Sequence, residues 1–342
     1  MTDVEKFLSA SDSAFSDAEA QSVKQENQGQ NWQSHLVDMV KLEEVPAFRL
    51  TFEGVSVCPS GSLSVISGGA KQGKSQFLTV AAAVMMSGKS FGCMKRGVAP
   101  QKILWADTEQ SVYDIQTNLG RLYTFAGIPA GTPTADVGLH VLGLRPCSPD
   151  ERREIIADAI NDLNPDVVII DGARDLLNDF NDVRESNEVV QYILSLSAAL
   201  PQTNFFVVIH TNDGTSKLRG HLGTELMNKC ADRFTITKDP HGFFKVEHIS
   251  RHQTISRPFY FKIDFDGHLT PLDGTEFGLI EEPDTTLAEI FEDAPDGLTY
   301  KEIEKRFADK QGCSAKDAKN ALTAYFEQKK IVKKGTKWNL QK

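Results

Sequence analysis

Short apolar runs alternate with longer amphipathic stretches along most of the chain. Runs of four to eight apolar residues are typical of buried strands, whereas apolar residues at every third or fourth position indicate helices. Strands separated by helix-length segments predict βαβ units and a mostly parallel α/β sheet covered by helices on both faces. The predicted strands are 62–67, 102–107, 138–143, 166–171 and 204–210, and the clearest helical stretches are 111–126 and 151–163.

The pattern changes after Cys230, where alternating strands follow one another closely. The predicted strands 233–238, 243–250 and 258–264 are separated only by turn-length segments. Connections this short join antiparallel neighbours. We therefore expect an antiparallel extension at one edge of the sheet.

The last part of the chain predicts a second, smaller domain. Residues 273–284 are acidic, contain Gly and Pro and have no period, which indicates a linker. Three short helical stripes follow, with capping signals at Thr299-x-x-Glu302 and Ser314-x-x-Asp317, and an alternating hairpin pattern ends the chain. Three small helices and a hairpin predict a winged-helix domain at 285–342.

Composition limits what the rest of the chain can be. Residues 1–44 are rich in Ser, Gln, Asn, Asp and Glu, so this arm is expected to be disordered or partly helical, and the α/β domain is placed at 45–272. No apolar run approaches the roughly 18 residues of a membrane span, and no secretory pattern is visible. We expect a cytoplasmic protein without a membrane partner. Its five scattered cysteines are expected to be reduced thiols.

Charge is distributed unevenly over the 342 residues. The net charge is −10, yet residues 298–342 carry 12 Lys and Arg against 5 Asp and Glu, which leaves −17 for the preceding 297 residues. An acidic body with a basic end predicts nucleic-acid contact confined to particular surfaces. A merely solvated Lys-rich end is the alternative interpretation.

A phosphate-loop pattern lies between a predicted strand and a predicted helix. In Gly68-x4-Gly73-Lys74-Ser75, glycines let backbone amides turn around phosphates, the lysine reaches the β and γ oxygens, and the serine can ligate Mg²⁺. A glycine-rich turn without a ligand is the alternative. The predicted ATP-binding residues are Gly68, Gly69, Ala70, Lys71, Gln72, Gly73, Lys74, Ser75 and Gln76.

Polar residues end three further predicted strands. Asp171 follows Val-Val-Ile-Ile, where a carboxylate is either a helix cap or a partner of Mg²⁺, and the phosphate loop favours the metal. Glu109 is the candidate that activates the attacking water, with Asp107 in reserve, and we expect it on a strand beside the phosphate-loop strand. His210 is a candidate sensor of the γ-phosphate, although a lone histidine is usually structural.

These motifs together resemble the RecA-like ATPases. The chain is most similar to the RepA-like plasmid replicative helicases and to the RecA-like AAA ATPases of mobile elements, over about residues 45–265. The resemblance implies that Lys74 and Ser75 bind phosphate and Mg²⁺, that Glu109 activates water, and that Asp171 supports the metal while His210 is the sensor.

The resemblance also implies DNA and a neighbouring subunit. The segment 217–223 resembles a loop that meets single-stranded DNA, and Arg251 occupies the place of an arginine finger, which makes it a catalytic candidate in trans. The Lys or Arg that commonly accompanies that finger is not reproduced, since Lys245 lies six residues away, and an ordinary solvated arginine is the alternative. A finger in trans implies a homo-oligomer, by analogy a hexameric ring.

The resemblance implies a DNA-associated ATPase motor or helicase acting in replication or mobilisation of a plasmid or transposon. An ATP-switched DNA-binding regulator or loader without unwinding activity is the alternative. A small-molecule kinase is disfavoured because no lid for an acceptor is apparent. The predicted winged helix favours duplex DNA through its polar face, although such domains also bind proteins; the candidate residues are Lys316, Lys319, Asn320, Thr323, Lys333, Lys334 and Lys337.

Overall fold

The chain divides into two compact units, Met1–Asp273 and Gly274–Lys342. The whole predicted linker lies outside the residues that the structure describes. So does the predicted arm, except for three of its residues. The computed structural model describes residues 36–37, 44–99, 101–179, 182–212, 218–255, 257–272, 285–294, 297–311, 314, 318–319, 322–323, 331–334 and 337–340.

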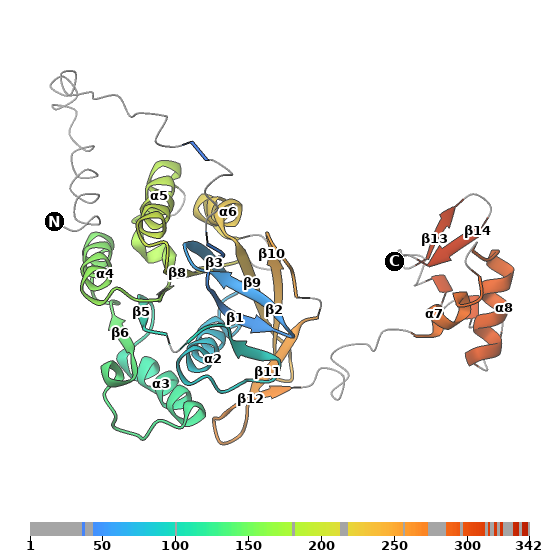
Figure 1. Cartoon of the computed structure of the whole chain (residues 1–342), viewed down its shortest axis with the longest axis horizontal. Coiled ribbons are helices and arrows are strands. Elements are labelled where there is room, and N and C mark those ends of the chain that lie inside the picture. Colours follow the sequence, from blue (N-terminus) through green and yellow to red (C-terminus); the bar gives the residue numbers. More distant parts are fainter. Residues whose placement is uncertain are drawn as a thin grey trace. The chain divides into compact units, whose positions relative to one another are not determined.

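A nine-stranded sheet forms the centre of the first unit (Figure 1). The strands from β9 to β6 run parallel, and β10, β11 and β12 continue the sheet in antiparallel pairs. This is the mostly parallel α/β sheet expected of a RecA-like ATPase. In spatial order the strands are β12 (Leu269–Leu272), β11 (Phe259–Ile263), β10 (Phe244–Ser250), β9 (Asp232–Lys238), β3 (Ser62–Gly68), β8 (Asn204–His210), β7 (Val167–Asp171), β5 (Ile103–Asp107) and β6 (Leu139–Gly143).

Helices cover both faces of this sheet (Figure 1). Successive strand residues point to opposite faces, so Ile169 of β7 packs in the core beneath α2 and α3, whereas Val168 and Ile170 pack in the core beneath α4, α5 and α6. The helices are α2 (Lys74–Ser87), α3 (Val112–Ala126), α4 (Pro149–Leu163), α5 (Val183–Ala199) and α6 (Gly220–Lys229), with short 3₁₀ turns at η4 (Thr134–Val137) and η5 (Ala173–Leu176).

Helix α2 is buried on all sides. A second sheet, formed by β1 (Phe48–Phe52), β2 (Val55–Pro59) and β4 (Met94–Arg96), contributes to the same core as α2 and the large sheet. Every residue of α2 from Phe77 to Met85 is fully buried. A helix that is apolar all round is stable only in such a place.

The structure corrects one detail of the predicted sheet. Strand β9 pairs in parallel with β3, so the antiparallel extension begins at β10 and not at β9. Helix α6 precedes β9 and acts as a crossover, and a crossover helix returns the chain parallel to the strand that it left. The small three-stranded sheet and β12 were not predicted.

The second unit contains two described helices and a hairpin. Helices α7 (Thr285–Phe291) and α8 (Tyr300–Gln311) and strands β13 (Ile331–Lys334) and β14 (Lys337–Leu340) enclose one apolar core, in which Ile303 is fully buried. The predicted capping pair of α8 is confirmed, since the amide of Glu302 donates to the Thr299 hydroxyl and the Thr299 amide donates to the Glu302 carboxylate.

The third predicted helix of this unit lies largely outside the described residues. Of its DNA-contact candidates, Lys316 and Asn320 fall outside, as does Asp317 of the second capping signal. Lys319 and Thr323 are described and exposed. The winged helix therefore stays a prediction. In the part of the chain that is described, no helix combines the length and apolar character needed to cross a bilayer.

Candidate nucleotide site

The turn between β3 and α2 has the shape of a phosphate loop for two steric reasons. Gly73 has φ of +94°, a conformation that residues with side chains rarely adopt, and a Cβ there would lie 2.3 Å from the Phe244 ring. A Cβ on Gly68 would lie 2.4 Å from the Ile236 carbonyl oxygen. Because both positions exclude side chains, only glycine fits at these two points of the turn.

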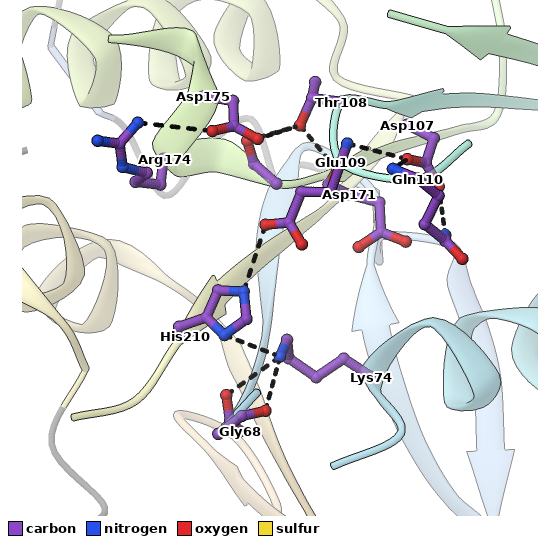
Figure 2. Close-up of polar contacts among 12 residues, drawn as sticks. Gly68, Lys74, Asp107, Thr108, Glu109, Gln110, Asp171, Arg174, Asp175 and His210 are labelled. Carbon is purple, nitrogen blue, oxygen red and sulfur yellow. Dashed lines mark hydrogen bonds and ion pairs between the residues drawn. The ribbon is translucent and has the colours of Figure 1, made fainter. Parts of the chain in front are cut away.

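Lys74 begins α2 with a nearly buried side chain. Its Nζ donates to the carbonyl oxygens of Gly68 at 3.2 Å and Gly69 at 2.9 Å, and it lies 3.2 Å from Nδ1 of His210 (Figure 2). Burial lowers the pKa of the Lys74 ammonium, and the nearby charges of Glu109 and Asp171 oppose that shift. The ammonium is thus held at the loop by carbonyls and faces two carboxylates.

Asp171 lies at the carboxyl end of β7 and is 4% exposed. Burial, followed by the charge of Asp107, raises its pKa to about 7, and a hydrogen bond with Ser75 opposes the shift. Its Oδ2 is buried and has no hydrogen-bond partner among the described residues. An unsatisfied buried carboxylate oxygen beside a serine hydroxyl is a donor set that suits Mg²⁺, so these two residues fit the predicted metal site.

Asp107 is engaged in the turn that carries Glu109. It lies directly opposite Asp171 in the register of β5 and β7. Its Oδ1 accepts hydrogen bonds from the amides of Glu109 at 3.1 Å and Gln110 at 2.8 Å, and its Oδ2 accepts one from the Gln110 side chain. This carboxylate therefore holds the turn that carries Glu109.

Glu109 reaches the phosphate loop from a distant strand. The expectation that it lies on a strand beside β3 is wrong, because β7 and β8 lie between β5 and β3. The chain after β5 instead crosses the end of β7, where the Thr108 amide donates to the Asp171 carbonyl oxygen. This crossing brings Glu109 Oε1 to 3.3 Å from Nε2 of His210, on β8.

His210 makes the environment of Glu109 favour the ionised form. The hydrogen bond from His210 is the largest cause that lowers the pKa of Glu109, and the charges of Lys74 and Arg174 act in the same direction against burial. Glu109 is consequently a carboxylate at neutral pH. It can accept a hydrogen bond from a water molecule.

The residues of this site lie within a known family of protein domains. A family model described as an AAA domain matches residues 39–216. The chain belongs to this family of P-loop ATPase domains. The AAA domain match spans β1 to β8 and so includes Lys74, Glu109, Asp171 and His210.

Among solved structures, the crystal structure of the RadB recombinase is similar at 17% identity, with a TM-score of 0.44, and the similarity covers 64% of this chain and 94% of that chain. No curated protein sequence matches the chain.

Residues that the sequence did not single out join the ends of β5 and β7. The Thr108 hydroxyl lies 2.9 Å from Oδ2 of Asp175 and 3.0 Å from the carbonyl oxygen of Asp171. Gly172 makes this contact possible, since a Cβ there would lie 2.1 Å from the Thr108 hydroxyl. The glycine directly after the apolar strand and its Asp171 is the only sequence signal that pointed to a close approach at this place.

The structure does not bring Arg251 to the AAA domain's phosphate loop. Arg251 follows the end of β10, which pairs with the beginning of β9, whereas the loop follows the carboxyl end of β3. Its guanidinium donates to the Asn228 carbonyl oxygen at 3.2 Å. Arg251 therefore cannot serve the site of its own chain, and only the trans role stays a prediction. In the predicted DNA loop, Lys217 lies outside the described residues.

Proposed function

We propose that this AAA domain protein binds ATP with Mg²⁺ at residues 68–76, hydrolyses it, and uses the hydrolysis as a DNA-associated motor related to the RepA-like helicases. The observation that carries the proposal is the meeting of Lys74, Asp171, Glu109 and His210 at one edge of the sheet (Figure 2). A cation, a metal-binding carboxylate and a water-binding carboxylate are the groups that phosphoryl transfer to water requires.

Each group has a separate task in this proposal. The loop amides and Lys74 bind the β and γ phosphates, for which the lysine gives up its hydrogen bonds to the Gly68 and Gly69 carbonyls. Ser75 and Asp171 would hold Mg²⁺, which neutralises charge on the phosphate oxygens when it is bound. Glu109 orients the attacking water and accepts its proton.

The association with DNA is supported by charge and by resemblance. Residues 298–342 carry a surplus of seven positive charges, whereas the preceding part of the chain is strongly acidic. Among the predicted contact residues, Lys333 and Lys337 are exposed on the β13–β14 hairpin. Basic residues on a hairpin can bind phosphates of a duplex, and the segment that includes Arg219 would meet single-stranded DNA.

We further propose a ring of identical subunits, in which Arg251 completes the site of a neighbour. The position of Arg251 at the opposite end of the sheet from the phosphate loop supports this, because two such ends can meet in a head-to-tail contact. By analogy with the RepA-like helicases, we expect six subunits, and a role in replication or mobilisation of a plasmid or transposon.

An ATP-switched regulator or loader is the second candidate. It would use the same site as a slow switch and would not separate strands, and the buried Asp171 with its high pKa is compatible with either use. The two candidates differ in what happens to DNA while ATP is consumed.

One set of assays tests the proposal. We expect the wild-type protein to hydrolyse ATP, single-stranded DNA to accelerate hydrolysis, and a forked duplex to be unwound. Lys74→Ala should lose all three activities, and Lys89→Ala, on an exposed lysine outside the loop, should keep them. Hydrolysis and DNA binding without unwinding would support the switch. An ATPase rate that no nucleic acid changes would argue against both DNA-linked functions.

A further inference from the structure

A chain of side-chain amides connects the helix after the phosphate loop with the turn that carries Glu109. The Gln76 Nε2 atom donates to Asn118 Oδ1 at 3.0 Å, and Asn118 Nδ2 donates to Gln110 Oε1 at 3.0 Å. Gln110 Nε2 then donates to the Asp107 carboxylate, which accepts from the Glu109 amide on its other oxygen. We call these four side chains, Gln76, Asn118, Gln110 and Asp107, the amide relay.

Arg121, which contacts Asn118, and Asp107, at one end of the amide relay, fix the direction of its hydrogen bonds. Arg121 donates to Asn118 Oδ1 at 2.9 Å, and since a guanidinium has no acceptor, the atom facing it must be the oxygen. The NH₂ group of Asn118 therefore donates a hydrogen bond to Gln110, whose side-chain oxygen accepts it. The NH₂ group of Gln110 is left for Asp107, whose side-chain oxygen accepts the hydrogen bond.

Two members of the amide relay are also shielded from water. Asn118 is 5% exposed and Asp107 is 1% exposed, so neither can exchange a lost partner for solvent without cost. Asn118 lies in the second turn of α3, and the two buried residues of this helix are Asn118 and Leu122. A buried asparagine bonded to three side chains is more than the packing of α3 requires.

We propose that Asn118 is a positioning residue for ATP hydrolysis: through Gln110 and Asp107 it fixes the turn that carries Glu109 relative to the helix that begins at Lys74. This inference rests on the proposed function, since it assigns Glu109 to water. Glu109 is separated from β3 by two strands and is therefore not aligned with the phosphate loop by the sheet alone. His210 connects Glu109 with Lys74, and the amide relay is a second connection between the turn that carries Glu109 and helix α2.

The fixed direction of the hydrogen bonds provides a test by reversal. Asn118→Asp keeps the acceptor for Gln76 and Arg121 but places a carboxylate opposite the Gln110 oxygen. Asp107→Asn places an NH₂ group opposite that of Gln110. In the double variant, Gln110 can rotate by half a turn, donate to the new carboxylate at position 118 and accept from the new amide at position 107. The number of charges stays the same.

The experiment measures kcat for ATP and the Kd of a non-hydrolysable ATP analogue in the full chain, with thermal melting as the check of folding. We expect each single variant to lose about tenfold in kcat, because a buried polar pair is mismatched. At pH 8 and saturating Mg²⁺, where Asp171 is largely ionised, the Kd should change by less than about twofold, and kcat of the double variant should recover to within about threefold of the wild type. A residue that only stabilised the fold would not show recovery in kcat at unchanged Kd.

A third variant keeps the test decisive if the buried substitutions prevent folding. Gln110→Leu acts at a half-buried position and breaks the amide relay there, and Gln116→Leu on the exposed face of α3 is its control. We expect only Gln110→Leu to lower kcat. Unchanged kcat in Asn118→Asp or Gln110→Leu, or a double variant slower than both single ones, overturns the inference alone. A wild-type protein without ATPase activity would overturn the proposed function, and this inference with it.

Discussion

Nε2 of His210 lies 3.3 Å from Glu109 Oε1, and its Nδ1 lies 3.2 Å from Lys74 Nζ. The Lys74 ammonium only donates, so Nδ1 accepts and the ring proton is on Nε2, where it points at the Glu109 carboxylate. One imidazole therefore connects the Lys74 ammonium, which we propose binds phosphate, with the carboxylate that we assign to water. A phosphate that draws Lys74 away also changes the partner of this ring.

Replacing His210 should affect the chemical step more than binding. We expect His210→Ala to lower kcat by about tenfold or more, since Glu109 loses the donor that orients it, while the Kd for ATP changes little. His210→Gln, which can accept from Lys74 and donate to Glu109, should recover part of the rate. Steady-state ATPase assays measure the effect, with exposed His252→Ala as the control. Equal rates for the alanine and wild-type proteins would remove His210 from the site.

Glu109→Gln should separate binding from hydrolysis. The amide keeps the size of the side chain but cannot take a proton from water, so we expect kcat to fall by about a hundredfold or more with nucleotide affinity retained. Because His210 holds the pKa of Glu109 below its ordinary value, acidification to pH 5 should not inactivate the enzyme through this group. Glu154→Gln, on the exposed side of α4, serves as the matched control. Hydrolysis that survives in Glu109→Gln would require another water-activating group.

Asp171 should make metal-dependent nucleotide binding increase with pH. Its pKa is raised to about 7, so a proton competes with Mg²⁺ below that pH, and raising the pH from 6 to 8 should strengthen binding of ATP in Mg²⁺ but not in EDTA. Asp171→Asn should abolish the dependence. Titration with a fluorescent ATP analogue at several pH values measures it, and a flat profile in the wild type would contradict the assignment.

The same shift predicts a stability effect without metal. The folded-state pKa of Asp171 lies above its ordinary value of 3.8, so between these two pH values the folded protein holds a proton that the unfolded chain has lost. In EDTA, the free energy of unfolding should therefore decrease as the pH rises from about 4 to about 7. Asp171→Asn lacks this contribution and should melt at least about 3 °C above the wild type at pH 8. Differential scanning calorimetry in EDTA provides the comparison.

A role for Arg251 in trans should appear in mixtures of inactive proteins. We expect Arg251→Ala and Lys74→Ala each to have little ATPase activity. Mixing them should restore part of it, because the intact site of the first can receive Arg251 from the second. Arg257→Ala, an exposed arginine nearby, should behave like the wild type. Absence of recovery in mixed oligomers, verified by co-purification, would leave Arg251 as a solvated surface residue.

A buried pair far from the phosphate loop should matter for stability. His248 accepts from the Ile255 amide and donates to Asp232 at 2.7 Å, and the other Asp232 oxygen accepts from the Cys58 amide at 2.9 Å. Because both side chains are almost fully buried, His248→Leu leaves Asp232 without its partner and should lower the free energy of unfolding by about 3 kcal/mol. Urea denaturation measures the change, with His268→Ala, at an exposed position, as the control.

Local pattern predicted eight of the nine strands of the large sheet, all but β12, to within about one residue at each end. The runs ending at Asp107 and Asp171 are apolar because both faces of these strands are covered, and such runs are visible in sequence. The order of the strands is not, since it depends on which crossover each helix makes. For that reason Glu109 was expected beside β3.

Other parts of the site leave little trace in a single sequence. Asn118 and Gln110 are polar residues in and before a helix, where such residues are ordinarily solvated, so nothing marks them as buried or connected. The small sheet was missed because its strands are short and one of its two pairings, that of β1 with β4, spans the whole of α2. Contacts between distant segments decide these features, and residue spacing does not encode them.

Strand β10 begins at Phe244, whose ring fills the space that a Gly73 side chain would occupy, and ends just before Arg251. A paired strand resists stretching along its length, so a shift of the loop by ATP or its products would press on one end and displace the other. In a ring with Arg251 facing the adjacent subunit, consumption of one nucleotide would thereby alter the completeness of the next site. In the proposed ring, hydrolysis by one subunit after another would follow from the contact of the Phe244 ring with Gly73.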